Sequence, residues 1–218
     1  MPSRAPASKR PVRVTVDVEA AADRLGRRHP LAYRLIRPPW RLLMRLLGRP
    51  TYWDARRHHR YYQEVVRLAQ RHTPAGGRVI DVGAKEVELL RQLSWFESRV
   101  ALDTRYVMPR PGIETVIADF HEYEPDGLFD LVLCLQVIEH LPRPQPFARK
   151  LLRTGRTVII SVPYGWPAGE HGSHVHDPVD DAKLRSWTGA APVETSLVED
   201  GKQRLVAVYR GSTSSAYG

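Results

Sequence analysis

The feature that most constrains the fold is a series of short apolar runs that begins at Arg78 and alternates with polar or helical stretches. Apolar runs of about four to eight residues are typical of buried strands, and their alternation with helices indicates an α/β fold with a largely parallel sheet. We predict strands at 78–82, 99–103, 113–117, 129–134, 156–162, 193–199 and 204–210, and helices at about 86–95, 144–153 and 180–187. The last two strands, separated by Gly201-Lys202, predict a closing antiparallel hairpin.

The segment before Arg78 has a different character. Residues 1–12 are rich in Pro, Ser, Ala and basic residues, which predicts a disordered tail. Apolar periodicity then predicts helices at 17–29, 31–48 and 51–72, ended by Thr-Pro-Ala-Gly-Gly at 73–77. We therefore expect a helical lid or extension over 13–77, an α/β domain over 78–211 and a flexible tail over 212–218.

The net charge of +9 is concentrated at the N-terminus, since residues 1–72 hold 17 Lys/Arg and only 5 Asp/Glu. Such a block suits an anionic partner (nucleic acid, an acidic membrane surface or a negatively charged substrate) or is simply a solvated helical surface. No apolar run approaches the roughly 20 residues that span a bilayer. With no apolar signal core and a single cysteine, Cys134, we expect a cytoplasmic protein without a transmembrane segment.

Two predicted strands end in an acid. Residues 78–83 read Arg-Val-Ile-Asp-Val-Gly and residues 99–104 read Arg-Val-Ala-Leu-Asp-Thr, so Asp81 and Asp103 stand 22 residues apart, the length of one β-α-β step. These segments resemble the first two motifs of class I, Rossmann-like methyltransferases. At the carboxyl end of the second strand, a carboxylate can accept hydrogen bonds from both hydroxyls of a ribose.

Further segments resemble the same family in the same order. Ala118-Asp119-Phe120 resembles the segment that contacts adenine, and residues 135–141, Leu-Gln-Val-Ile-Glu-His-Leu, resemble the signature that follows the fourth strand. The resemblance implies a Rossmann-like seven-stranded methyltransferase sheet with an N-terminal helical extension, and S-adenosylmethionine as the cofactor. The residues that it assigns to cofactor binding are Asp81, Gly83, Ala84, Asp103, Thr104, Asp119, Phe120, Leu135 and Gln136.

The first loop departs from the family pattern, because it keeps one glycine, Gly83, where two or three are usual. S-adenosylmethionine has no phosphate to bind, so close approach of the backbone can suffice. A dehydrogenase would need the Gly-x-Gly-x-x-Gly turn for a pyrophosphate, and this sequence lacks it. A catalytically inactive relative that keeps the scaffold is the remaining alternative.

Glu139 and His140 follow the fourth strand, where the methyl donor and the acceptor are expected to meet. Methylation of an alcohol requires removal of its proton, and imidazole titrates near neutral pH, so His140 is the predicted general base, with Glu139 beside it. The alternative is that this pair only caps or orients local structure.

Residues 170–178, Glu-His-Gly-Ser-His-Val-His-Asp-Pro, hold three histidines. His174 and His176 are alternate residues of an extended segment, so both are expected to face one site. With Glu139 and His140 they form a candidate site for a divalent ion such as Mg²⁺, which would polarise a sugar diol. The alternative is a helix cap by Asp177 with histidines on the surface.

The Glu-His pair followed by a histidine-rich loop resembles the small-RNA 2′-O-methyltransferases and small bacterial sugar O-methyltransferases, including those of methylmannose polysaccharide synthesis. The RNA enzymes carry a second glutamate three residues before the pair, and here Gln136 removes that charged ligand. We expect O-methylation of a sugar or glycoside, with Tyr62, Tyr164, Trp166 and His171 as candidate acceptor contacts.

Two alternatives remain. One is an RNA ribose 2′-O-methyltransferase that uses Arg56, Arg57 and Arg60 on phosphates. The other is a non-catalytic membrane-surface or scaffold protein with an interfacial helix at 40–47. A small-molecule acceptor is thus the expected partner and nucleic acid the less favoured one, while the sequence leaves open whether the chain forms a homodimer.

Overall fold

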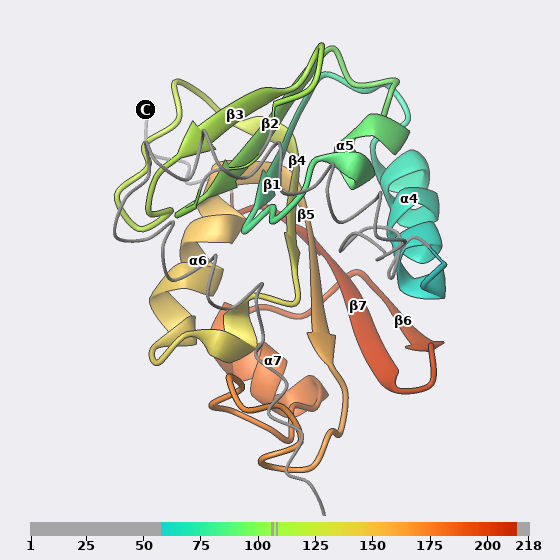
Figure 1. Ribbon diagram of the computed structural model, residues 1–218, viewed down its shortest axis with the longest axis vertical. Coiled ribbons are helices and arrows are strands. Elements are labelled where there is room, and N and C mark those ends of the chain that lie inside the picture. Colours follow the sequence, from blue (N-terminus) through green and yellow to red (C-terminus); the bar gives the residue numbers. More distant parts are fainter. Residues whose placement is uncertain (1–57, 106, 108, 213–218) are drawn as a thin grey trace, which may run out of the picture.

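A seven-stranded sheet in the order β3-β2-β1-β4-β5-β7-β6 forms the centre of the computed structural model, which describes residues 58–105, 107 and 109–212 (Figure 1). β1 to β5 are parallel, and β7 is antiparallel to both β5 and β6. Each strand lies within one residue of its predicted bounds, so the α/β prediction and the closing hairpin are confirmed. The strands are β1 Arg78–Val82, β2 Ser98–Asp103, β3 Glu114–Ile117, β4 Phe129–Leu135, β5 Gly155–Pro163, β6 Glu194–Glu199 and β7 Gln203–Arg210.

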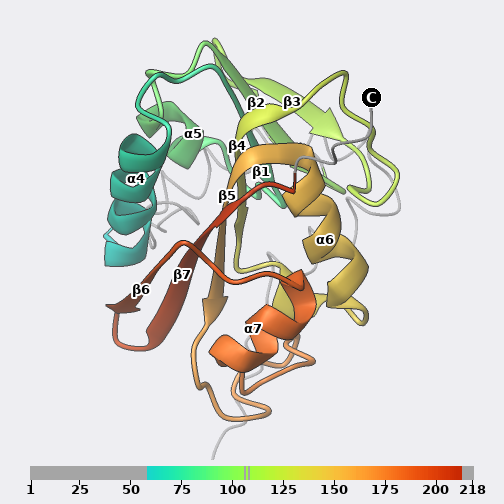
Figure 2. The same cartoon turned by 180° about the vertical axis from the view of Figure 1, so that it is seen from behind.

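Helices cover both faces of the sheet (Figures 1 and 2). Helices α4 (Arg60–His72) and α5 (Glu88–Gln92) lie on one face, and α6 (Pro144–Thr154) and α7 (Asp181–Thr188) lie on the other. Each face has its own hydrophobic cluster, as expected for strands buried on both sides. The helix predicted at 86–95 is shorter than expected, because the chain turns after Leu93 with the N–H of Phe96 donating to the Leu93 carbonyl.

The helix predicted at 51–72 ends at His72 as expected, but α4 begins only at Arg60, because the backbone of His59 is extended. Its buried face includes Tyr61, Val65 and Leu68 and packs in the same cluster as strand β7. At its N-terminus, the carboxylate of Asp200, from the turn between β6 and β7, accepts hydrogen bonds from the N–H groups of the first two helical residues at 2.7 and 2.9 Å. The helix is therefore one layer of the domain core.

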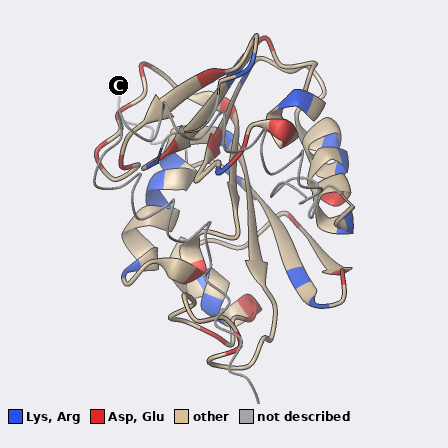
Figure 3. Ribbon diagram, in the orientation of Figure 1, with Lys and Arg blue, Asp and Glu red and all other residues tan. Residues whose placement is uncertain are grey.

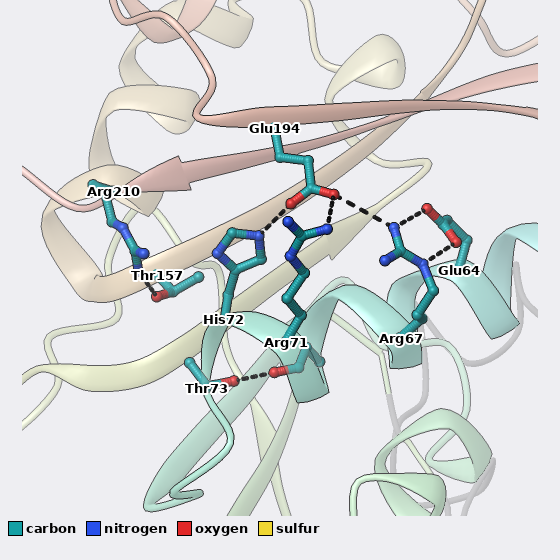
Figure 4. Close-up of polar contacts among 9 residues, drawn as sticks. Glu64, Arg67, Arg71, His72, Thr73, Thr157, Glu194 and Arg210 are labelled. Carbon is teal, nitrogen blue, oxygen red and sulfur yellow. Dashed lines mark hydrogen bonds and ion pairs between the residues drawn. The ribbon is translucent and has the colours of Figure 1, made fainter.

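The other end of α4 is joined to the sheet edge by a network of charged side chains centred on Glu194 of β6 (Figure 4). One carboxylate oxygen of Glu194 lies 2.7 Å from His72 Nε2, and the other accepts from Arg71 at 3.1 Å and from Arg67 at 3.5 Å. Exposed ion pairs each contribute little, about 1 kcal/mol at most, so the main effect is to fix the helix in register with the hairpin.

The basic excess of the chain lies outside the described residues, since residues 1–57 hold 14 Lys/Arg against 4 Asp/Glu. Within the described part, both signs of charge are interspersed over the helices and loops (Figure 3). No helix among the described residues is long and apolar enough to cross a bilayer. The predicted tail at 1–12, the helices at 17–29 and 31–48, and the end of the chain after residue 212 lie outside the described residues.

Candidate functional site

A cavity of about 600 Å³ lies at the carboxyl ends of the parallel strands, where open α/β sheets bind their ligands. Its lining has two parts. The loop half comes from the loops after β1, β2 and β3, and its polar or aromatic members are Lys85, Asp103, Thr104, Arg105, Asp119, Phe120 and His121, together with Gly83. The histidine half consists of Glu139, His140, Trp166, His171, Ser173, His174 and Arg204, and Gln136 and Val137 lie between the two at the end of β4.

Gly83 shapes the loop half through its backbone. The N–H groups of Gly83 and Ala84 both donate to the carbonyl of Leu102, at 2.8 and 3.1 Å, which holds the loop against β2. Gly83 has a φ of +81°, and a Cβ at this position would lie 2.6 Å from a methyl group of Val137. Only glycine satisfies both constraints, because it has no side chain to clash and tolerates positive φ.

Asp103 and Asp119 end neighbouring strands of the loop half. Each accepts a hydrogen bond at 2.8 Å from the backbone N–H two residues later, which fixes both carboxylates in tight turns. Phe120, next to Asp119 in the sequence, is buried and lies edge-on to Phe147 of α6, with ring centroids 5.0 Å apart. This half therefore combines a carboxylate with an aromatic wall.

Three of the residues predicted to bind the cofactor do not line the cavity: Asp81, Ala84 and Leu135. Asp81 lies within β1 and is buried; its burial and the charge of Asp103 raise its pKa to about 7. Ala84 packs in the core next to α5. The other predicted residues, Gly83, Asp103, Thr104, Asp119, Phe120 and Gln136, all line the cavity.

Gln136 turns the chain at the end of β4. It has a φ of +55°, the one positive φ of a non-glycine residue in the described part of the chain. Its N–H donates to the carbonyl of Ser161 at 2.9 Å and its side-chain amide donates to Ser161 Oγ at 3.2 Å. Such a conformation costs about 1–3 kcal/mol, and here it directs the chain into the 3₁₀ helix η1 (Ile138–His140).

Glu139, in η1, is a buried carboxyl without a hydrogen-bond partner. Its side chain has no exposed surface, and among the described residues neither of its carboxyl oxygens has a hydrogen-bond partner. Burial raises the pKa of Glu139 to about 8, the charge of Asp177 adds to this, and the charge of Arg204 opposes it. Without a ligand, this carboxyl is therefore largely protonated at neutral pH.

His140 and His174 are both oriented through Nδ1. His140 Nδ1 lies 3.0 Å from both the carbonyl and the Oγ of Ser173; the carbonyl can only accept, which favours the tautomer with the proton on Nδ1. His174 Nδ1 lies 2.7 Å from the buried carboxylate of Asp177. Each ring thus keeps Nε2 for another partner, and His140 Nε2 lies 3.8 Å from Glu139 Oε1. Burial lowers the pKa of His140, which keeps its imidazole neutral.

Glu139, His140 and His174 come together, with one possible ligand atom from each residue all within 4.8 Å of one another. A carboxylate with two imidazoles, each held through its other nitrogen, is a common arrangement for binding a divalent ion. His176 does not join them. Its Nε2 lies 2.7 Å from the Leu141 carbonyl and its ring packs against Trp187, so the expectation that alternate residues face one site does not apply to this loop.

The capping alternative for this loop also differs from the structure. The N-cap of α7 is Asp180, which accepts from the N–H of Lys183 at 2.7 Å, whereas Asp177 orients His174.

Of the four residues predicted to contact the acceptor, two line the cavity and two do not. Trp166 and His171 line the cavity, and both rings stack on His174, at 5.6 and 4.4 Å between centroids. Tyr164 donates its hydroxyl to Asp181 at 2.9 Å, and Tyr62 is buried in α4 against the sheet. Neither tyrosine lines the cavity.

Arg204 is a cavity residue that the sequence analysis did not identify. It occupies the second position of β7, in the run Gln-Arg-Leu-Val-Ala-Val-Tyr-Arg, and only 7% of its surface is exposed. The sequence signal that could have identified it is a basic residue next to the apolar run of a predicted strand.

Comparison with known proteins agrees with this geometry. A match to the methyltransferase domain family spans residues 52–195, and no curated protein matches the sequence. The fold is similar to that of the N-methyltransferase NodS from Bradyrhizobium japonicum WM9 in complex with S-adenosyl-l-homocysteine. The TM-score is 0.57 at 13% identity, covering 70% of this chain and 86% of that one.

Two further structures share the fold. One is the 1,6-didemethyltoxoflavin-N1-methyltransferase of Burkholderia thailandensis, with a TM-score of 0.54 at 17% identity over 96% of this chain and 93% of that one. The other is the N-terminal domain of EvdMO1 in the presence of S-adenosylhomocysteine and D-fucose, with a TM-score of 0.51 at 19% identity over 71% and 84%.

Proposed function

Because this chain belongs to the methyltransferase domain family, we propose that it transfers the methyl group of S-adenosylmethionine to a hydroxyl group of a sugar or glycoside. The family match confirms the class that the sequence motifs predict. The observation that carries the proposal is the single cavity that connects Asp103 at the end of β2 with the cluster of Glu139, His140 and His174.

The loop half fits S-adenosylmethionine. Its turn carboxylate, Asp103, is positioned to accept hydrogen bonds from ribose hydroxyls, and Phe120 and Phe147 offer aromatic surface for a nucleobase. A cavity of about 600 Å³ is in the range of small-molecule and cofactor sites. When bound, S-adenosylmethionine supplies an electrophilic methyl group on a sulfonium sulfur.

His140 is the proposed base. An alcohol is a weak nucleophile until its proton is removed, and a positioned base contributes about 10²–10⁴-fold to such a step. The neutral imidazole, with its Nδ1 proton directed to Ser173, presents the basic Nε2 lone pair. His140 would therefore accept the proton of the attacking hydroxyl at Nε2.

A divalent ion is the alternative role for the same cluster. The two unpartnered oxygens of Glu139 and the Nε2 atoms of His140 and His174 fit such an ion, which would supply a Lewis acid for the acceptor hydroxyl. Two imidazoles and one carboxylate suit Mn²⁺ or Zn²⁺ better than Mg²⁺, which prefers oxygen ligands. In that version His140 is a ligand, and the acceptor loses its proton to another base or to water.

The acceptor class rests on the aromatic wall of the histidine half. Trp166 and His171, both stacked on His174, line the cavity with aromatic surface of the kind against which sugar rings bind. One of the structures that share the fold was obtained in the presence of D-fucose, and two others are N-methyltransferases, so amines belong among the acceptors tested.

A terminal RNA ribose is the second candidate acceptor, favoured by the basic excess of residues 1–57.

The test is a methyl-transfer assay on the full chain. Binding of S-adenosylmethionine is first measured by calorimetry, and labelled methyl transfer is then followed to a panel of sugars, glycosides, amines and a short RNA. Each assay is run with Mg²⁺, with Mn²⁺ and after chelation. We expect transfer to a sugar hydroxyl. Transfer only to amines or only to RNA would show that the acceptor is not a sugar. Failure to bind S-adenosylmethionine would refute the proposal.

A further inference from the structure

Arg204 places a guanidinium group in the histidine half of the cavity. Its strand is held in the sheet by apolar neighbours, so the side chain is 93% buried even though it is charged. The guanidinium lies between two aromatic rings, 5.0 Å from the centroid of Tyr61 and 5.4 Å from that of Trp166. These faces hold the group in place and leave its edges, which carry the N–H donors, for other partners.

The charge of Arg204 has no counter-ion among the described residues, because none of their carboxylates lies within the 4.0 Å of an ion pair. Among the described residues, its side chain makes one long hydrogen bond, from Nη1 to the Lys202 carbonyl at 3.4 Å, and Nε is buried without a partner. A guanidinium has five N–H donors, and a buried charge is costly unless it is paired. The cavity therefore contains a buried positive charge that a bound anion would neutralise.

The position of Arg204 in the sheet indicates that this anion belongs to the acceptor and not to the cofactor. Arg204 lies in β7, opposite Pro163 of β5, and β7 is four strands along the sheet from β2, which corresponds to roughly 19 Å at the usual strand spacing. It lies near Glu139, whose pKa its charge lowers, and beside Trp166. It is thus on the far side of the catalytic cluster from Asp103.

Building on the proposed function, we propose that the acceptor carries an anionic group, a carboxylate or a phosphate, and that Arg204 binds it. A planar guanidinium matches both groups through paired hydrogen bonds, and such charge-assisted pairs are about twice as strong as neutral ones. The ring of Trp166 is already packed against His174, Lys202 and Arg204, so the contact proposed for the acceptor here is the guanidinium of Arg204. The substrate class becomes an acidic or phosphorylated sugar.

The experiment measures anion preference at the histidine half. The full chain is saturated with S-adenosylhomocysteine and titrated by calorimetry with D-glucuronate, D-glucose 6-phosphate, inorganic phosphate and neutral D-glucose. At least one anion is expected to bind roughly 30-fold more tightly than D-glucose, the scale for a buried charge pair, and the carboxylate and phosphate arms identify which group is preferred. No preference for any anion over D-glucose would overturn the proposal.

Variants test the residue. Arg204→Met is expected to abolish the preference, while the matched control Arg210→Met, at the opposite end of β7 and bonded to Thr157, keeps it. Unchanged affinity for S-adenosylhomocysteine shows that Arg204→Met is folded. If Arg204→Met does not fold, Arg204→Lys takes its place: it keeps the charge without the planar guanidinium, and it should retain only part of the anion preference.

Two results would contradict the assignment. One is an anion preference that survives in Arg204→Met. The other is an equal loss of affinity for S-adenosylhomocysteine in a variant that still melts cooperatively, which would place the cofactor's own carboxylate on Arg204. If the wild-type chain does not bind S-adenosylmethionine, the proposed function fails, and titration of the anions without cofactor still tests Arg204.

Discussion

The two halves of the cavity differ in how their polar groups are satisfied. In the loop half, Asp103 and Asp119 each bond to a backbone N–H two residues away. In the histidine half, both oxygens of Glu139 and Nε of Arg204 are buried without a partner among the described residues, and so is Oδ1 of the adjoining Asp177. Buried polar groups are normally paired with protein, water or ligand, so the described protein groups satisfy the carboxylates of the loop half, whereas in the histidine half several donors and acceptors are left for water or a ligand.

This difference has a physical origin in chain connectivity. A turn carboxylate finds its partner within a few residues, because strand, turn and donor belong to one short segment. Glu139, His174 and Arg204 come from η1, from the loop after β5 and from β7, and each was brought to the cavity by the packing of its own element.

The largest effect is expected for the cluster of Glu139, His140 and His174, the proposed catalytic group. His140→Ala should reduce turnover about 100-fold or more, the usual scale for loss of a general base, and should leave the affinity for S-adenosylmethionine unchanged because the proposed site of that ligand is the loop half. Steady-state rates and calorimetry measure the two quantities. Near-normal turnover would leave His140 as a structural residue.

The response to divalent ions separates the two roles of His140. If His140 is a base, the rate of His140→Ala still depends on Mn²⁺ or Mg²⁺ as in the wild type. If His140 is a metal ligand, His140→Ala loses this dependence, and His174→Ala shows the same defect. His176→Ala is the matched control, since this imidazole bonds to Leu141 instead of joining the cluster.

The next effect concerns the loop half. Asp103→Asn should weaken binding of S-adenosylmethionine roughly 10- to 100-fold, because hydrogen bonds to a charged group contribute about 1.5–3 kcal/mol, while kcat at saturating cofactor stays the same. Calorimetry provides the affinity. Asp126→Asn, a change of an exposed carboxylate that pairs with Arg78 outside the cavity, is the control and should bind normally. Equal affinity in both variants would remove Asp103 from the site.

A smaller effect is expected for the loop itself. Gly83→Ala introduces a Cβ that would overlap Val137 and puts an L-residue at a φ of +81°, which should lower the free energy of unfolding by about 1–3 kcal/mol. In urea titrations, adding Val137→Ala should recover part of the loss, since it removes the clash but not the backbone strain. If the second change recovers nothing, Val137 does not constrain the loop.

The smallest effect is a pH dependence of stability. In the folded protein the pKa of Glu139 is raised to about 8 and that of Asp81 to about 7, above their values of 4.5 and 3.8 in the unfolded chain. At a pH between the unfolded and the folded pKa of each group, the folded state binds more protons than the unfolded state. The free energy of unfolding therefore falls as pH rises through this range. The contribution is complete below the unfolded pKa and is lost as pH passes through 7 to 8.

Thermal melting across this range checks the sign. The wild-type Tm should decrease toward alkaline pH, and Glu139→Gln should flatten the curve most strongly near its upper end. If the cluster binds a divalent ion, Mn²⁺ should raise the Tm of the wild type at alkaline pH and have little effect on Glu139→Gln. A wild-type Tm that rises with pH would contradict the assignment of Glu139 as a buried, unpaired acid.

Most of the fold was predictable because apolar runs have lengths and periods that sterics and burial impose. The strands were found within one residue of their bounds, whereas the helix at 88–92 was overestimated, because Leu93 and Phe96 continue the apolar pattern through a turn. The strand-end residues of the loop half were predictable for a related reason: parallel strands end at the same edge, so residues such as Asp103 and Asp119 must lie close together.

The sequence by itself determined the sheet, its closing hairpin and the group of residues from which the cavity is built, since these follow from local periodicity and the order of strands. Tertiary structure decided which of those residues meet. It brought His174 and not His176 to Glu139, made Asp180 and not Asp177 the helix cap, and placed Arg204 opposite Trp166. The loop after β5 has no repeating pattern to specify its conformation. Its course depends on contacts with distant residues, such as the hydrogen bond from the N–H of Val175 to the carbonyl of Glu139, which exist only once the strands have packed.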